Sequence, residues 1–172
     1  YQKLNLAEKA LPFLLKGGKD KEAASLLAQV GQHWVVCGRD KLFNYYLQQL
    51  PVKYQNDPAI FLALGDMDRV ANRYEKAAGW YRKAEKIYRS SNNKIGQSHS
   101  NRSLGELYLD IIEPEIAQTY LRKAYKLLTE KQITEKAHLL YLMSENMINY
   151  GNSHKAKLYF RANEEAVNQY RK

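Results

Sequence analysis

The apolar positions of the chain follow helical spacing along most of its length. Between residues 74 and 88 they fall at positions 77, 80, 81, 84, 87 and 88, in steps of three and four. This period places them on one face of an α-helix, whereas a strand would show alternation. Clusters of turn-forming residues separate such segments. The pattern predicts an all-α fold of about nine helices, over residues 3–16, 20–37, 40–49, 58–70, 73–89, 95–110, 113–129, 134–150 and 153–170.

Three helix starts carry a local signal. Asp57 before Pro58 offers an N-cap followed by proline at the first helical position, where the missing N–H costs nothing. Glu113 before Pro114 is expected to start a helix in the same way. Ser153 is expected to cap the last helix.

One sequence pattern recurs along the chain. Leu-Gly at residues 64–65, and again at 104–105, is followed by alanine, a large residue and alanine at fixed separations. The two copies lie 40 residues apart and comprise Gly65, Ala77, Tyr81, Ala84 and Gly105, Ala117, Leu121, Ala124. A weaker third copy, 39 residues later, has Ser144, Ala156, Phe160 and Asn163, and an earlier one fits Ala23, Leu27 and Val30.

A repeat of this length has a physical reason. One helix pair cannot bury its apolar face alone, whereas stacked pairs can. The small residues mark places where two helices approach closely, and Tyr81 and Leu121 fill the space between. We predict a right-handed superhelix of antiparallel helix pairs forming one domain over residues 1–172, with divergent helices at 1–57 and clearer repeats at 58–172.

This spacing resembles the tetratricopeptide repeat (TPR), whose usual length is about 34 residues. Residues 18–67 are expected to form a long helix, a turn at Gly38 and a short helix that ends at Leu50-Pro51. An extended link then leads to Asp57-Pro58, where the next helix starts. That layout is similar to the start of the helical-repeat region in MalT-like bacterial transcription activators. The resemblance implies a sensor region that receives an inducer, with a nucleotide-binding module and a DNA-binding or other effector domain elsewhere. We therefore expect a fragment of a longer bacterial chain.

Charge and composition add little to this picture. The net charge is +9, from 27 basic and 18 acidic residues. Basic residues gather on the second helices, at Arg82, Lys83, Lys86, Arg89, Arg122, Lys123 and Lys126. Acidic residues are interleaved with them, which is typical of a solvated outer face. Because a helix placed for the major groove is missing, we expect no sequence-specific binding of nucleic acid.

The remaining composition suits a cytoplasmic protein. Cys37 is the single cysteine, and its apolar neighbours predict a small buried residue in a reducing compartment. No apolar run approaches the roughly 18 residues of a membrane span. The tyrosines are expected to pack between helices, with Tyr141 as the exception that could face a ligand.

Motifs for catalysis are missing from the sequence. There is neither a GxxxxGK[ST] loop nor a GxGxxG loop to cradle phosphate. The four histidines do not stand at metal-ligand spacing from cysteine or carboxylates. No serine sits in a strand-to-helix elbow. We expect a protein that is not an enzyme, with no catalytic residue, no metal and no cofactor.

The first helix of each pair should line a concave groove. Counted from Gly65, Gly105 and Ser144, positions −6, −3, +1, +4 and +5 should face it. The polar members, with Arg102 at the centre, are the predicted ligand- or partner-binding residues: Asp66, Arg69, His99, Arg102, Glu106, Asp110, His138, Tyr141, Glu145 and Asn149. The Lys/Asn pattern with which some TPR domains grip a peptide carboxylate is missing, because Leu62 and Asp66 stand in its place.

These observations predict a non-catalytic sensor and interaction module of a bacterial transcriptional regulator, binding an inducer or partner in the groove. The expected partners are proteins, neighbouring domains of the same chain, or a small-molecule or peptide inducer, with no membrane contact. The alternatives are a generic TPR protein–protein scaffold and a peptide-pheromone receptor domain.

Overall fold

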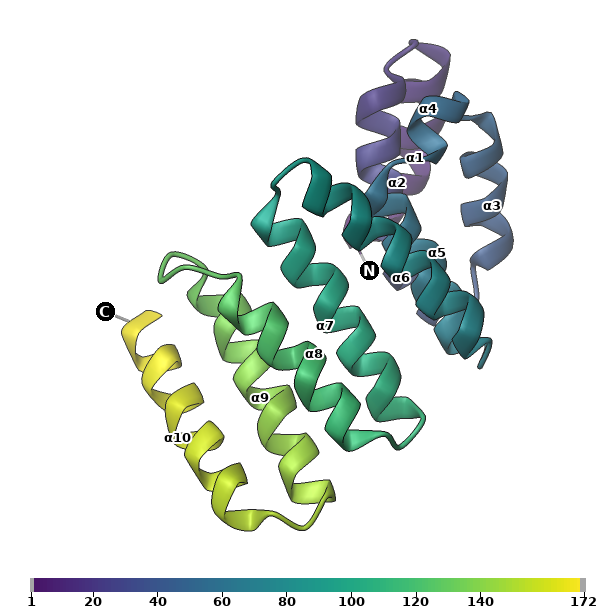
Figure 1. Ribbon diagram of the computed structural model, residues 1–172. Helices are drawn as coiled ribbons and strands as arrows, with labels where there is room; N and C mark the ends of the chain where they lie inside the picture. Colours follow the sequence, from purple (N-terminus) through teal and green to yellow (C-terminus); the bar gives the residue numbers. More distant parts are fainter. Residues whose placement is uncertain (1, 171–172) are drawn as a thin grey trace. The chain divides into compact units, whose positions relative to one another are not determined.

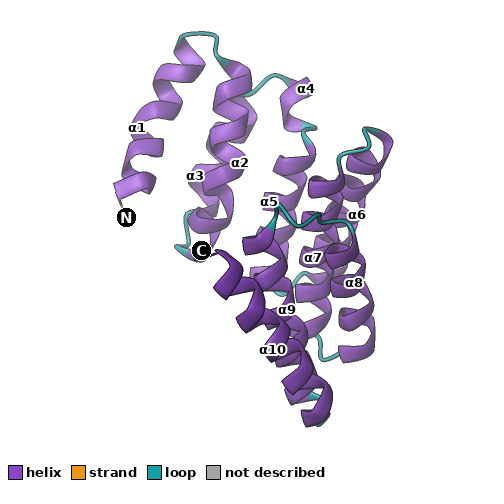
Figure 2. Ribbon diagram, turned by 90° about the vertical axis from the view of Figure 1, so that its left-hand side faces the viewer, coloured by secondary structure: helices purple, strands orange, loops and turns teal. Residues whose placement is uncertain are grey.

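A computed structural model describes residues 2–170, except for the side chains of residues 2–5, 32, 35, 36, 166, 167, 169 and 170. Within this range every regular element is a helix, as Figure 2 shows. The ten helices are α1 (Gln2–Lys16), α2 (Asp20–Val36), α3 (Asp40–Gln49), α4 (Val52–Gln55), α5 (Pro58–Val70), α6 (Tyr74–Ser90), α7 (Lys94–Asp110), α8 (Pro114–Lys126), α9 (Ile133–Asn149) and α10 (Ser153–Tyr170). The fold is an all-α solenoid, as predicted.

The chain divides into two compact units, unit 1 (Tyr1–Ile87) and unit 2 (Tyr88–Lys172). In unit 1, α2 packs against α1, α3 and α5. The core of unit 1 contains the fully buried rings of Trp34 and Phe43. In unit 2, α7, α8, α9 and α10 are successive neighbours (Figure 1), with Leu121, Leu139 and Met143 in the core. The single domain expected over residues 1–172 stays a prediction.

The repeat has the packing role that its small residues predict. A Cβ added at Gly65 would stand 2.3 Å from the Tyr81 ring, and one at Gly105 would stand 2.7 Å from Leu121. Because each glycine has no side chain, the large residue of the second helix can pack directly against the first helix. The four alanines of these two copies, at 77, 84, 117 and 124, are fully buried. The register of the first two copies is confirmed.

The third copy follows the pattern less closely. Ala156 is buried, but the Phe160 ring is 51% exposed and does not fill space between helix pairs. The physical reason is position, because no helix within residues 2–170 follows α10 to cover that face. Ser144 keeps the small-residue role and is buried.

The turn after each first helix has the same backbone shape in three copies. Seven residues after Gly65, Gly105 and Ser144 stand Asn72, Ile112 and Gly151, with φ of 58°, 61° and 74°. The following N–H closes the helix end onto a carbonyl five residues earlier, at 2.7 Å, 2.9 Å and 2.8 Å. Glycine and asparagine suit this left-handed conformation, whereas a β-branched side chain is strained there.

Several local predictions need correction. The extended link before Asp57 contains the short helix α4, and α8 ends at Lys126 rather than at 129. The Asp57 carboxylate accepts a hydrogen bond from the Ala59 N–H at 2.8 Å, so this cap is confirmed. Glu113 makes no such bond, although Pro114 does begin α8.

Two further predictions, both at helix ends, are also wrong. Ser153 is inside α10, and Asn152 caps it by accepting from the Lys155 N–H at 3.1 Å. Cys37, expected to be buried, is exposed. It lies beyond the end of α2, where the chain turns through Gly38 with a φ of 70°, and so leaves the apolar face of the helix.

A buried amide joins α9 to α8. Asn146 donates two hydrogen bonds from Nδ2, to the Pro114 carbonyl at 2.8 Å and to Gln118 Oε1 at 3.0 Å. Asn146 and Gln118 are both buried. Because a buried amide without partners is costly, these bonds favour one register between the two helices.

Candidate functional site

The predicted groove residues of unit 2 lie on the exposed sides of α7 and α9. On α7, His99, Arg102 and Glu106 are partly exposed and Asp110 is exposed. On α9 the side chains at the corresponding positions are all exposed: His138, Tyr141, Glu145 and Asn149. The register count therefore identified an accessible polar surface in unit 2.

Three of these residues meet at one carboxylate. Arg102 Nε lies 3.3 Å from Glu106 Oε1 on the same helix, and His138 Nε2 of α9 lies 3.8 Å from the same oxygen. The side chains are 25%, 17% and 47% exposed for Arg102, Glu106 and His138. The structure thus brings two donor side chains to one acceptor; the Arg102 Nε atom is buried, and His138 is the most exposed of the three side chains.

His99 is partly buried and lies close enough to Arg102 to feel its charge. Burial lowers the pKa of His99 below its usual value, and the nearby Arg102 charge lowers it further. Glu135 opposes this shift with the weakest of the three effects. His99 is therefore neutral at physiological pH, so its ring can both donate and accept a hydrogen bond.

The two predicted groove residues of unit 1 have a different environment. Asp66 is buried, and its Oδ1 accepts a hydrogen bond from the Tyr81 hydroxyl at 2.7 Å. Burial and then the Asp66 charge raise the pKa of Tyr81 far above its usual value, while Arg69 acts in the opposite direction. The expectation that Asp66 faces an open groove is wrong. The adjacent Gly65 has no side chain, so the Tyr81 ring of α6 packs closely on α5 and its hydroxyl binds Asp66. Ligand binding by the ten predicted residues stays a prediction.

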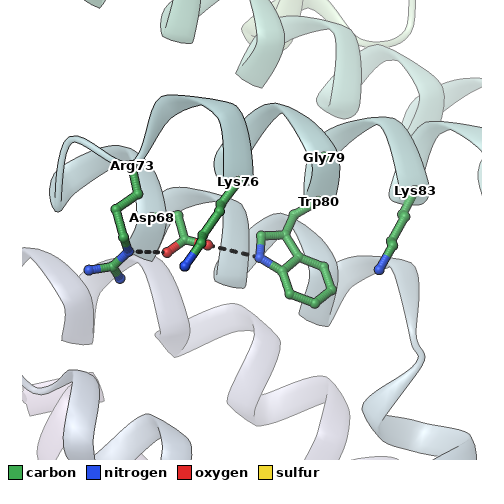
Figure 3. A pocket seen from close by; sticks show the side chains of 6 residues that line it. All are labelled: Asp68, Arg73, Lys76, Gly79, Trp80 and Lys83. Carbon is green, nitrogen blue, oxygen red and sulfur yellow. Dashed lines mark hydrogen bonds and ion pairs between the residues drawn. The ribbon is translucent and has the colours of Figure 1, made fainter.

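A second site, which the sequence analysis did not single out, lies on α5 and α6. A shallow hollow of about 570 Å³ is lined by Asp68, Arg73, Lys76, Gly79, Trp80 and Lys83. Figure 3 shows how these side chains lie. The sequence predicts Lys83 on the solvated outer face, with the other basic residues. Trp80 and Lys83 follow Gly65 by 15 and 18 residues, as Tyr120 and Lys123 follow Gly105, so this spacing marks an aromatic–lysine pair in both copies but does not mark the hollow.

The basic residues of the second helices are exposed, as expected, and some also contact aromatic residues. Lys123 Nζ lies 5.0 Å from the centre of the Tyr120 ring. Arg122 donates to the Tyr159 hydroxyl from Nε at 3.2 Å and from Nη2 at 3.0 Å. These positive charges are therefore held in place, although they are still open to solvent.

Among the described residues, no group of three or more histidine, cysteine or acidic side chains is placed to hold a metal ion. Within residues 2–170, no helix has both the length and the apolar character that crossing a bilayer requires.

Comparison with known proteins identifies the fold. No protein-family model matches the sequence, and no curated protein matches it. Among solved structures, a mutant of the protein MamA is similar to this chain, with a TM-score of 0.54 and 16% sequence identity. The match covers 96% of this chain and 97% of that one. The chain has a TPR-like helical-repeat fold.

Proposed function

We propose that this chain is a non-catalytic protein-interaction module that binds a peptide segment of a partner on the α7–α9 surface of unit 2. The observation that carries the proposal is the cluster of Arg102, Glu106 and His138. Arg102 and Glu106 pair within α7, His138 of α9 adds a contact from the second helix, and each side chain keeps part of its surface exposed.

The chemistry of the cluster favours a peptide over a simple anion. Arg102 already shares its charge with Glu106 at 3.3 Å, so a free anion would compete with that carboxylate. A peptide backbone offers both N–H and C=O groups, which would match the Glu106 acceptor and the Arg102 donors together. Tyr141, 48% exposed on the neighbouring helix, adds an aromatic surface for a partner side chain.

A narrower proposal assigns the module to a bacterial transcriptional regulator in the cytoplasm, where the partner segment or a small inducer would act as the signal. It rests on the layout of residues 18–67 alone. The coding sequence on either side tests it. A P-loop module upstream and an effector domain downstream would support it, whereas a short N-terminal helix-turn-helix would favour a peptide-pheromone receptor.

A peptide selection tests the proposed surface. Random 12-residue peptides are selected on the wild-type protein, and the best is titrated by calorimetry into wild type and Arg102→Ala. Loss of one charge-assisted bond, about 1.5–3 kcal/mol, should weaken binding roughly 10- to 150-fold.

Lys126→Ala is the matched control, since it removes one exposed positive charge from α8. It should leave the affinity within about twofold. Melting curves of both variants should match wild type. Equal affinity for wild type and Arg102→Ala would place the peptide elsewhere and reject this surface.

A further inference from the structure

The hollow on α5 and α6 belongs to unit 1 and is separate from the proposed peptide surface. Most of its side chains project from one side of α6 and of the turn before it, and Asp68 of α5 lies behind them (Figure 3). It contains three cationic side chains and one carboxylate, a net charge of +2.

That single carboxylate is already fully engaged. Asp68 Oδ1 accepts from Arg73 Nε at 2.6 Å, and Oδ2 accepts from Trp80 Nε1 at 2.9 Å. The Asp68 carbonyl also accepts from the Arg73 N–H at 2.7 Å. Asp68 therefore orients Arg73 and Trp80 and neutralises one positive charge, which leaves the charges of Lys76 and Lys83 uncompensated within the hollow.

An aromatic wall lies between the cations. The rings of Phe61 and Trp80 stack with centroids 5.4 Å apart and planes 25° apart. Lys83 Nζ lies 4.4 Å from the centre of the Trp80 ring and 5.9 Å from that of Phe61. Phe61 is buried, whereas Trp80 is partly exposed and offers an apolar surface beside two ammonium groups.

The second copy of the repeat shows which part of this arrangement is ordinary packing. There, Lys123 covers Tyr120 much as Lys83 covers Trp80. However, Tyr108 replaces Asp68 and stacks on Tyr120, with centroids 5.4 Å apart and planes 3° apart.

The neighbouring charges of the two copies differ as well. Glu113 and Ile116 stand in unit 2 where Arg73 and Lys76 stand in unit 1. The aromatic–lysine pair is thus common to both copies, whereas the cationic hollow is particular to unit 1. Packing alone does not require three positive charges at this place.

We propose that this hollow binds an acidic segment of a partner protein, with carboxylates at Lys76 and Lys83 and an apolar side chain against Trp80. Lys76 and Lys83 are seven residues apart on one helix, or about 10 Å along its axis. A peptide in the polyproline II conformation has three residues per turn and a rise of about 3.1 Å, so side chains three residues apart lie on one face about 9 Å apart. The matching pattern is an acidic residue, a spacer, an apolar residue and a second acidic residue.

The test measures fluorescence polarisation of fluorescein-Gly-Glu-Gly-Leu-Glu-Gly-amide at about 150 mM salt, where nonspecific surface attraction is screened. Saturable binding with a Kd below about 1 mM is expected. A peptide with glutamine in place of both glutamates should bind at least about tenfold more weakly. Equal binding of the two peptides, or none to either, overturns the proposal.

Two pairs of variants separate the hollow from net charge. Lys76→Ala/Lys83→Ala should weaken binding at least about tenfold. Lys86→Ala/Lys126→Ala removes the same charge from exposed positions outside the hollow and should change binding less than about twofold. Equal losses in the two pairs mean nonspecific attraction and reject the site.

A third variant keeps the charge unchanged. A Cβ at Gly79 meets nothing within 4 Å, so Gly79→Leu should fold normally and project into the hollow. It should abolish binding of the acidic peptide while its melting temperature stays at or above that of wild type. Undiminished binding to Gly79→Leu, or tighter binding of single-stranded oligothymidine that is lost in the same variants, would overturn the assignment to an acidic peptide.

Discussion

Replacing Gly65 by alanine tests how closely α5 and α6 pack. The new Cβ would stand 2.3, 2.6 and 2.9 Å from three atoms of the Tyr81 ring, where ordinary contacts are 3.4–4 Å. The ring or the helix must therefore move by more than about 1 Å, and overpacking on that scale costs about 1–3 kcal/mol. Tyr81 is fully buried, and its hydroxyl is held by Asp66, so we expect the upper end of this range.

Part of that cost is offset by the helix itself. Alanine stabilises a helix interior by about 0.5–1 kcal/mol relative to glycine. The net destabilisation of Gly65→Ala is therefore about 2 kcal/mol. Gly79→Ala, on α6 with open space around its Cβ, is the matched control and should stabilise by about 0.5–1 kcal/mol.

Urea unfolding followed by tryptophan fluorescence measures this difference. Trp34 and Trp80 are the two tryptophans of the chain, and both lie in unit 1, so the signal reports the unit that carries the substitutions. Gly65→Ala and Gly79→Ala should differ by about 3 kcal/mol in free energy of unfolding. Equal stabilities, or a more stable Gly65→Ala, would refute the close approach of Tyr81 to α5.

Two further predictions concern unit 2. Ile112→Gly should raise the free energy of unfolding in urea by about 1 kcal/mol, because the isoleucine backbone is strained at a φ of 61°. Its side chain is 86% exposed, so little packing is lost, and no gain in stability would refute the strain. His99 has a lowered folded-state pKa, so the unfolded chain binds the proton more readily and the stability contribution is complete above the ordinary value of 6.5. It is lost as pH falls from 6.5 through the lower folded-state pKa, and unfolding midpoints should therefore fall less steeply between about pH 7.5 and 5 in His99→Gln. Parallel pH profiles of His99→Gln and wild type would contradict this.

The helices could be predicted because their local signals agree with the packing. Asp57 and Pro58 mark the start of α5 both chemically and in the structure. The α7 register was also readable, since Gly105 fixes which positions face α8. Short α4 was not predictable from periodicity, because its four residues are too few to show a helical period.

The candidate sites were predicted unevenly, for a similar reason. Counting from Gly105 identified Arg102 and Glu106, which lie on one face of one helix. Counting from Gly65 failed at Asp66, because its environment depends on the Tyr81 ring of another helix. The hollow could not be predicted because it needs Asp68 of α5 and Trp80 of α6 at hydrogen-bond distance, which no single helical pattern encodes.

The buried amide of Asn146 bears on how a chain of similar repeats avoids folding out of order. Its position, two residues after Ser144, is occupied by Met67 and Leu107 in the other copies. Its partner Gln118 corresponds to Ala78 in unit 1. If α9 stacked where another first helix belongs, this amide would be buried without an acceptor, at a cost of about 1–3 kcal/mol. A single polar side chain thus makes one repeat distinct and penalises assembly in the wrong order, which apolar contacts alone do less selectively.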